Sequence, residues 1–472
     1  MVRRTTAVNT APNAKGPGGR QKWSAHLPLG AIIALAALGS AIFRQGAYHE
    51  AQHRTFALLM VAAGCSLLLN ARSRRNLAVS ALLVSPLLFS AALSLAFSSD
   101  RGDARSTFLE IALIGIGLAA GMTVPRRGYE TVLDAVLVIG LVVAGTALWG
   151  VIMHETPWGR ITAGVWRGSS SLTYANAAAA VAGPIALMQF RRLVDRSAPL
   201  HSAATTFLVI GVASTQSRGG VLAVALLSLT LLRPSLIRQT ALAAFPIAIG
   251  TAIGVPAVLI YADASEGGNP PLAFALLLLG VATSAILASK PGSPQRFGVP
   301  AGVFGLLALL FLAAMGQISR FTERLTLRSG TTAQGQDAQV LFGDRAKEWS
   351  SAWDQVVERP IVGHGPGAVE LTWIEDGRSF RAEFVHNEYL ELIVTQGFVG
   401  LAALGLAAAL VIRRWRMTSA MPITGPIGLA VGAFLLHSSL DFLWHLPALP
   451  VLFALVLGLA LGRSPVRDDV DS

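Results

Sequence analysis

The feature that most constrains this chain is a succession of apolar runs, each close to the length of a membrane-spanning helix. A spanning helix needs about 20 predominantly apolar residues. We place the runs at 27–43, 55–69, 77–97, 107–124, 131–153, 174–190, 203–216, 219–232, 240–261, 271–288, 298–316, 389–412, 424–440 and 448–462. They predict an all-α polytopic membrane protein with about 14 transmembrane helices (12–14). The remaining residues are too few for a large soluble catalytic domain.

Charge supports this interpretation and indicates an orientation. Charged residues make up 13% of the 472 residues, against roughly a quarter in soluble domains. When the N-terminus is placed inside and the helices alternate, most of the 37 Lys and Arg residues fall on the cytoplasmic side, as membrane topology favours. We therefore expect both termini to be cytoplasmic. The net charge of +11 is explained without nucleic acid as a partner.

The runs divide the chain into six segments. We expect a disordered basic cytoplasmic tail at 1–26, transmembrane helices 1–5 at 27–153, helices 6–11 with outer arginine motifs at 154–316, a long extracytoplasmic loop at 317–388, helices 12–14 at 389–462 and a cytoplasmic tail at 463–472. Within the long loop, GDRAKEWSSAWDQVVE predicts an amphipathic helix. Trp349, Trp353 and Val356 are expected on one face, which rests at the membrane interface.

Polar residues at the outer helix ends are the candidates for function. Arg218 lies in the outer turn SRGG, where glycines and the following helix N-terminus favour an anion. An arginine that reaches lipid head groups would look the same in sequence. His386 opens HNEYLELIVTQGFVG, in which Glu388, Glu391 and Thr395 share one helix face that descends into the membrane. Hydrogen bonding between helices is the alternative role for this polar stripe.

Several kinds of chemistry lack their sequence signals. The chain has no Gly-rich P-loop and no HExxH. Its single cysteine, Cys65, excludes an intramolecular disulfide and CxxC redox chemistry. We therefore expect no cofactor and no metal.

Three motifs together resemble the O-antigen ligase/polymerase family of polytopic membrane proteins. They are SRGGVLAVALLSL at 217–229, GDRAKEWSSAWDQVVERPIVGHGPGAV at 343–369 and HNEYLELIVTQGFVGL at 386–401. WRGSSSLTYANAAAA at 166–180 is a weaker match, and HSSLDFLWHLPAL at 437–449 is also similar. The resemblance covers roughly residues 160–460. The chain departs from the family pattern at about 240–288, which looks like an inserted hairpin.

The resemblance implies a function and an expected set of site residues. The family moves a glycan from a polyprenyl-diphosphate carrier, such as undecaprenyl diphosphate, to an acceptor outside the cytoplasmic membrane. The implied reaction is metal-independent and inverts the anomeric carbon. His386, Arg218 and Arg345 match the catalytic residues of the family, and diphosphate or substrate binding is expected at Arg167, Ser217, Gly219, Asn387, Glu388 and Tyr389. His386 would accept the acceptor's proton or hydrogen-bond the diphosphate.

Two questions stay open at this stage. A lipid, polysaccharide or protein acceptor would make the chain a ligase, a polymerase or a protein O-glycosyltransferase, and the motifs do not separate these. A transporter that flips lipid-linked glycan is the alternative function, although its polar residues would be expected near the membrane midplane. A cell-wall glycosyltransferase of the shape, elongation and division type is a more distant alternative.

Overall fold

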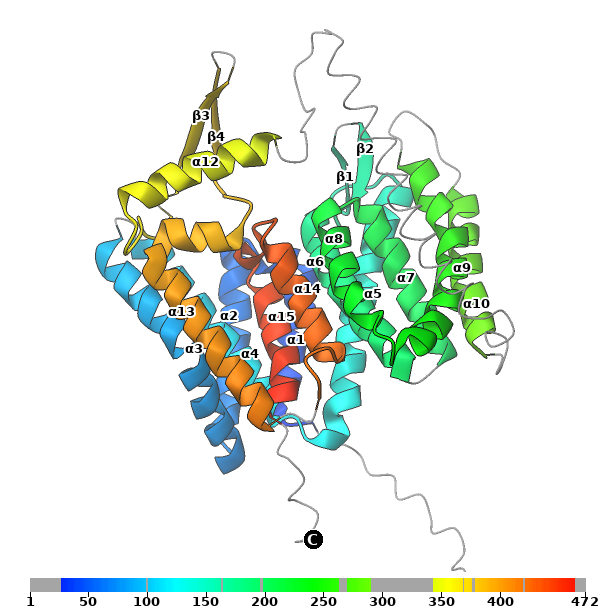
Figure 1. The fold of residues 1–472 in the computed structure, drawn as a ribbon, viewed down its shortest axis with the longest axis horizontal. Helices are drawn as coiled ribbons and strands as arrows, with labels where there is room; N and C mark the ends of the chain where they lie inside the picture. The colour runs from blue at the N-terminus through cyan, green and yellow to red at the C-terminus, as the bar shows by residue number, and fades with distance from the viewer. Residues whose placement is uncertain are drawn as a thin grey trace, which may run out of the picture.

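The fold is that of a mostly helical membrane protein, with its elements shown in Figure 1. The computed structural model describes residues 27–98, 101–162, 164–195, 198–262, 270–289, 343–367, 369–375, 378–418 and 421–462. The two expected tails, the eleventh expected span at 298–316 and the first part of the long loop lie outside the described residues.

The helices coincide with the expected apolar runs within the described residues. They are α1 (Leu29–Phe43), α2 (Glu50–Leu67), α3 (Ala71–Phe97), α4 (Arg101–Thr123), α5 (Tyr129–Ile152), α6 (Ala175–Asp195), α7 (Pro199–Thr215), α8 (Arg218–Ser228), α9 (Ile237–Tyr261), α10 (Pro270–Ser289), α12 (Gly343–Glu358), α13 (Glu388–Thr418), α14 (Pro426–Ser438) and α15 (Ala448–Leu461). Among them, α12 is the amphipathic helix expected in the long loop.

Length and hydropathy support a multi-pass membrane protein. In the described part of the chain, six helices are long and apolar enough to cross a membrane: α3, α4, α5, α9, α10 and α13. Helices α1, α8, α14 and α15 are apolar but shorter. The count of about 14 crossings and the cytoplasmic placement of both termini therefore stay predictions.

Two small hairpins modify the all-α expectation. Strand β1 (Gly159–Thr162) pairs antiparallel with β2 (Val165–Gly168), and β3 (Leu371–Glu375) pairs antiparallel with β4 (Arg378–Ala382). Both lie in segments expected to be outer loops. The sequence between β3 and β4 is Asp-Gly, a common two-residue hairpin signal that hydropathy does not detect.

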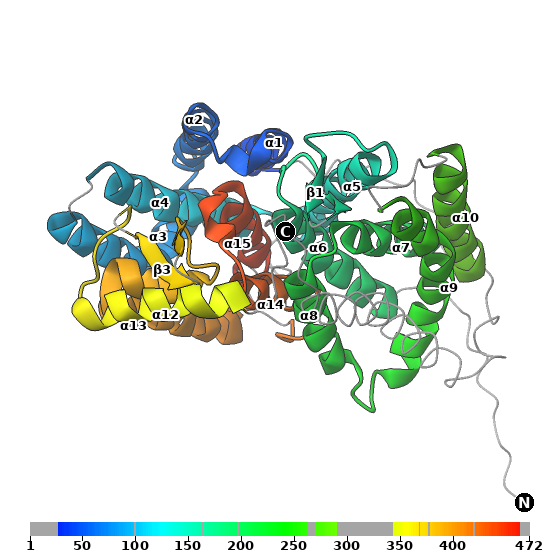
Figure 2. The same ribbon diagram turned by 90° about the horizontal axis from the view of Figure 1, so that it is seen from above.

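Small residues allow the helices of the core to approach closely. Helix α15 lies against α4, where a Cβ on Gly121 would come within 2.0 Å of the Leu455 carbonyl oxygen. Gly250 and Gly280 meet in the same way between α9 and α10. Such contacts drive helix association in lipid, where apolar surface alone gives little preference for another helix. The predicted inserted hairpin corresponds to α9 and α10, which pack on α7 (Figure 2).

Helix α13 is broken at Gly397, which changes the expected course of its polar face. Gly397 has φ 67° and ψ −169°, and the part before it runs across the direction of the longer part that follows (Figure 1). Phe398 N–H donates to the Pro360 carbonyl at 2.8 Å, and Val399 N–H donates to the Ile361 carbonyl at 3.2 Å. The face with Glu388, Glu391 and Thr395 therefore lies on the short segment, not on the long apolar one.

Candidate functional site

The buried carboxylate of Asp441 is the centre of the candidate site. This residue is 1% exposed and follows the end of α14. Tyr174 donates its hydroxyl proton to Asp441 Oδ1 at 2.6 Å, and Asn176 Nδ2 donates to Oδ2. Arg345 Nη2, from the first turn of α12, lies 3.4 Å from Oδ2. A buried carboxylate requires such donors. One of them here is the guanidinium of Arg345, a residue that its motif position predicts to be functional.

Tyr174 is fixed as a proton donor to this carboxylate. Its hydroxyl supplies the proton of this hydrogen bond, because a carboxylate only accepts.

Arg167 joins the same network from β2. Its Nη2 donates to Asn176 Oδ1 at 3.0 Å, and its Nε donates to the Thr215 carbonyl at 2.9 Å. Asn176 thus links Arg167 to Asp441, which links in turn to Arg345. The two arginines come from segments far apart in sequence and are held in one polar cluster.

His386 lies beside this cluster and is held by a second carboxylate. Its Nδ1 is 3.0 Å from Oε2 of Glu348, which is three residues after Arg345 on α12. Because a carboxylate only accepts hydrogen bonds, Nδ1 carries the proton and the neutral ring has its lone pair on Nε2. The backbone of His386 has φ 50°, a left-handed conformation that is uncommon outside glycine and recurs at functional sites.

The pKa of the His386 imidazole is raised above its ordinary value. Burial lowers this pKa, but the hydrogen bond to Glu348 and the charges of Asp441 and Glu348 raise it by more. The ring is therefore a stronger base than free histidine, and the Glu348 carboxylate stabilises it once it has accepted a proton.

Aromatic rings form the wall between His386 and the Asp441 cluster. The ring of Phe442 stacks on Tyr174, with centroids 4.9 Å apart, and on Phe384 at 4.5 Å. The His386 ring meets Phe442 edge to face, with centroids 4.9 Å apart. These contacts fix the orientation of the imidazole and surround the charged groups with low-dielectric material, which strengthens electrostatic interactions.

Arg218, Ser217 and Gly219 form the N-terminus of α8, next to the same end of α14. The Ser217 hydroxyl oxygen accepts a hydrogen bond from Gly220 N–H at 3.3 Å and so caps the helix. A Cβ on Gly219 would lie 3.2 Å from Nε2 of His437, a buried residue four positions before Asp441. The glycines of SRGG thus let α8 pack on His437, and this packing places Arg218 at the Asp441 end of α14.

Asn387, Tyr389 and Glu388 have structural contacts in this structure. The Asn387 side-chain oxygen accepts from the backbone N–H groups of Tyr389 and Leu390, each at 3.1 Å, and caps α13. The Tyr389 hydroxyl donates to the Leu435 carbonyl at 2.7 Å. Glu388 accepts from the backbone N–H of Trp444. Their proposed contact with substrate remains a prediction.

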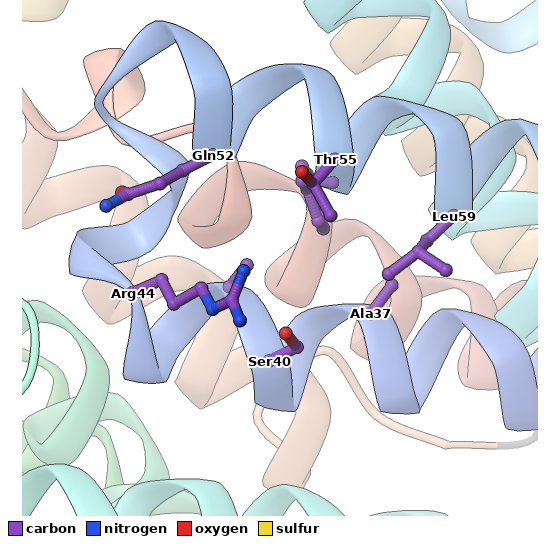
Figure 3. A pocket seen from close by; sticks show the side chains of 8 residues that line it. Ala37, Ser40, Arg44, Gln52, Thr55 and Leu59 are labelled. Carbon is purple, nitrogen blue, oxygen red and sulfur yellow. The ribbon is translucent and has the colours of Figure 1, made fainter.

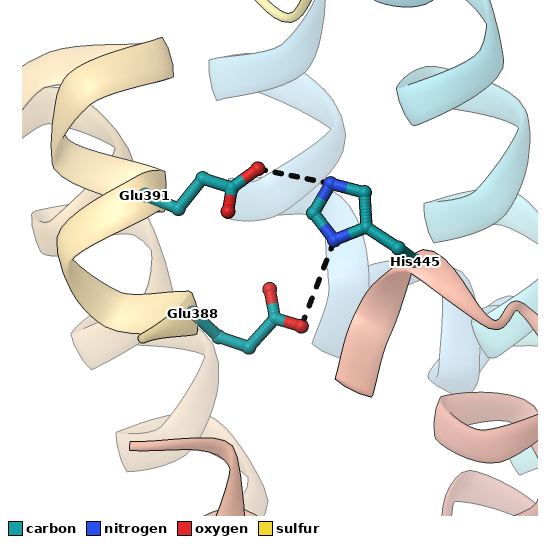
Figure 4. Close-up of side chains that lie close together, drawn as sticks. All are labelled: Glu388, Glu391 and His445. Atoms are coloured by element: carbon teal, nitrogen blue, oxygen red, sulfur yellow. Dashed lines mark ion pairs between the residues drawn. The ribbon is translucent and has the colours of Figure 1, made fainter. Parts of the chain in front are cut away.

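Glu388 and Glu391 hold His445 between them (Figure 4). Glu391 Oε1 is 2.9 Å from His445 Nε2, and Glu388 Oε1 is 3.8 Å from Nδ1. Burial lowers the pKa of His445, but the two carboxylates raise it well above its usual range. These three residues could present metal ligands, since their donor atoms lie within 4.8 Å of one another.

Five residues of this site were missed by sequence reasoning: Glu348, Tyr174, Asn176, Asp441 and His445. Two signals were available. Asp441 and His445 are ionisable residues in the stretch LDFLWHLPAL at 440–449, whose other residues are apolar, and Glu348 is one helical turn from Arg345. Neither signal names the partner, because Asp441 is 96 positions from Arg345 and 265 from Asn176.

A separate small pocket lies between α1 and α2 (Figure 3). Ser40, Arg44, Gln52 and Thr55 supply its polar lining. Figure 2 places α1 and α2 on the side of the molecule opposite α12. The pocket is therefore distinct from the Asp441 cluster.

Comparison with known proteins matches one part of the chain. Residues 258–405 match the family model described as O-antigen ligase. The matched segment contains Arg345 and His386, whereas Arg167, Arg218 and Asp441 lie outside it. No curated protein matches the chain.

Proposed function

We propose that this chain is a membrane glycosyltransferase acting on lipid-linked glycan. Its resemblance to the O-antigen ligase family is supported by the match over residues 258–405. In this proposal the donor is a glycan on a polyprenyl diphosphate. The acceptor is a lipid, polysaccharide or protein at the outer face of the cytoplasmic membrane. The observation that carries the proposal is the convergence of Arg345 and His386, both in the matched segment, beside the buried Asp441.

The arginines suit a diphosphate leaving group. A guanidinium stays charged and presents several N–H donors to phosphate oxygens. Asp441 and Asn176 hold Arg345 and Arg167 in place before substrate arrives. Donors that are already oriented stabilise charge as it develops on the leaving oxygen, with little reorganisation during the reaction. Arg218, at the adjacent N-terminus of α8, is assigned to the same diphosphate.

His386 is assigned the role of general base. Its Nε2 takes the proton from the acceptor hydroxyl, and the hydroxyl oxygen forms a new bond to the anomeric carbon. The bond from that carbon to the diphosphate oxygen breaks, and its electron pair leaves with the polyprenyl diphosphate. Attack opposite the leaving group inverts the anomeric centre. Glu348 stabilises the protonated imidazole, and no step requires a metal.

The test uses purified full-length protein in vesicles that contain a polyprenyl-diphosphate glycan. Arg345→Ala and Arg218→Ala should each abolish transfer to an added acceptor, and both proteins should still insert in the membrane. Arg381→Ala is the matched control, because Arg381 is an exposed β4 arginine whose ion pair with Glu370 lies at the surface. Normal transfer by both variants would overturn the proposal.

The same preparation distinguishes transfer from transport. A flippase would move the lipid-linked glycan across the vesicle membrane without forming a new glycosidic bond. Transfer from donor already exposed on the reacting face, with inverted product, is the expected result. Translocation without product would replace the proposal with the transporter.

A further inference from the structure

Helix α12 carries two apolar faces, and only one is covered by protein. Ala352 and Val356 are buried, and they pack with Val385 and Ile393. Trp349 faces the same way, since its Nε1 donates to the Val385 carbonyl at 3.0 Å. The expectation that Trp349, Trp353 and Val356 share one lipid-facing side is therefore wrong for Trp349 and Val356.

The second face is exposed and strongly apolar. Trp353 is 50% exposed and Val357, one turn later, is 65% exposed. Ile361, in the turn that follows the helix, is 68% exposed. We call Trp353, Val357 and Ile361 the α12 stripe. A stripe of this kind left in water would be costly, and such surfaces mark contact with a membrane or another protein.

The position of the α12 stripe favours contact with the membrane over contact with another protein. The carbonyls of Pro360 and Ile361 accept hydrogen bonds from Phe398 and Val399, the first residues after the Gly397 break. These residues begin the long apolar segment of α13. Figure 1 shows the C-terminal end of α12 beside the upper end of that segment.

Exposed apolar side chains occur on both sides of this junction. Phe398, Leu406 and Ile412 on the long segment of α13 are 47%, 54% and 44% exposed, as expected for side chains that face lipid. Ile361, whose carbonyl accepts from Val399 N–H, places the α12 stripe next to the start of this segment. Tryptophan is the side chain most favoured at the boundary of lipid and water.

We propose that the α12 stripe inserts into the outer interface of the lipid bilayer and fixes the C-terminal end of α12 to the membrane. The polar residues on the neighbouring face of the helix, such as Asp354 and Glu358, remain in water. This is the arrangement of an amphipathic helix lying in the interface plane. The inference concerns the surface of α12 and does not depend on glycan transfer.

The test uses the full-length chain with a single spin label. Cys65 is the only cysteine, so Cys65→Ser gives a background free of other thiols. Trp353→Cys, Val357→Cys and Ile361→Cys place the label on the stripe. Asp354→Cys and Glu358→Cys are matched controls, each one residue from a stripe position and about 100° around the helix. All positions are exposed, so the labels require no repacking.

The proteins are reconstituted in vesicles of phosphatidylethanolamine and phosphatidylglycerol. Collision of each label with oxygen, which concentrates in lipid, is compared with collision with a water-soluble nickel chelate. Stripe labels should show a severalfold higher oxygen-to-nickel ratio than the controls. Equal ratios would overturn the proposal. Shielding from both reagents would also overturn it, because a protein partner or a second copy of the chain would then cover the stripe.

Discussion

At the scale of single residues, Asp441 determines how the arginines are held. Its buried carboxylate is shared by Arg345, Tyr174 and Asn176. Asp441→Asn keeps the shape of the side chain but removes the charge that balances Arg345. Because a hydrogen bond to a charged group contributes about 1.5–3 kcal/mol, we expect glycan transfer to fall by roughly tenfold or more.

Initial rates of transfer by purified protein check this prediction. Asp354→Asn serves as the control, since Asp354 is an exposed aspartate on α12. A folded Asp441→Asn protein with wild-type rates would show that Arg345 needs no carboxylate partner.

Glu348 should control the pH at which the enzyme becomes active. Only neutral His386 can accept a proton, so the rate should rise with pH through the raised pKa of His386. Glu348→Gln removes the charge that raises this pKa and leaves a neutral amide oxygen as a weaker acceptor for His386 Nδ1. The rise in rate should therefore move to lower pH. A pH profile of initial rates measures this, with Glu358→Gln as the exposed control; an unchanged profile, or a shift to higher pH, would exclude the proposed base.

The same pairing has a consequence for folding. Because the His386 pKa is higher in the folded chain, this group stabilises the fold most at pH values below its unfolded pKa. The contribution disappears as pH rises through the folded pKa.

Sequence reasoning at this scale found the residues of motifs and missed their partners. Arg345, His386 and Arg167 were selected from motif positions, and the structure brings them to one cluster. Asp441 belongs to that cluster through contacts far apart along the chain. A single sequence does not show that residues so far apart along the chain lie close together in the fold. It can do so only where one known motif contains both residues.

At the scale of elements, hydropathy predicted where helices occur. It did not predict where a helix bends or which of its sides packs against the protein. The apolar runs coincide with helices because only a helix satisfies its backbone hydrogen bonds within lipid. The break in α13 depends on one glycine and on two carbonyls of another segment, which accept hydrogen bonds from the N–H groups of α13. The orientation of α12 depends on which of its two apolar faces meets Val385. Neither can be read from periodicity.

Gly397→Ala should destabilise the junction of α12 and α13. A Cβ at this position would lie 2.1 Å from the Ile361 carbonyl oxygen, and φ 67° is unfavourable for alanine. Backbone strain of this kind costs about 1–3 kcal/mol. Thermal unfolding of purified protein should show a lower Tm.

Gly405→Ala is the control for this change. It lies on the same helix, and nothing lies within 4 Å of its Cβ position. Its Tm should equal or exceed that of the wild type, because alanine favours helix. Equal Tm values for the two variants would show that the break tolerates a side chain.

At the scale of the whole molecule, the predicted topology places α12 and the Asp441 cluster outside. In a Cys65→Ser background, Thr372→Cys on β3 should react with a membrane-impermeant maleimide in intact cells. Arg72 lies between the apolar runs 55–69 and 77–97, which the alternation from a cytoplasmic N-terminus places inside, so Arg72→Cys should react only after permeabilisation. Both positions are exposed, so reagent access depends on the side of the membrane. The reverse labelling pattern would invert the predicted orientation of the chain.

The hydrogen bonds at the α13 break also join two segments of the chain. Phe398 and Val399 have lost their own helical acceptors, and the carbonyls of Pro360 and Ile361 replace them. Separating the two segments here would cost the hydrogen bonds of two backbone amides. The α13 break therefore fastens the C-terminal end of α12 to the start of the long segment of α13, and Arg345 lies at the other end of the same short helix.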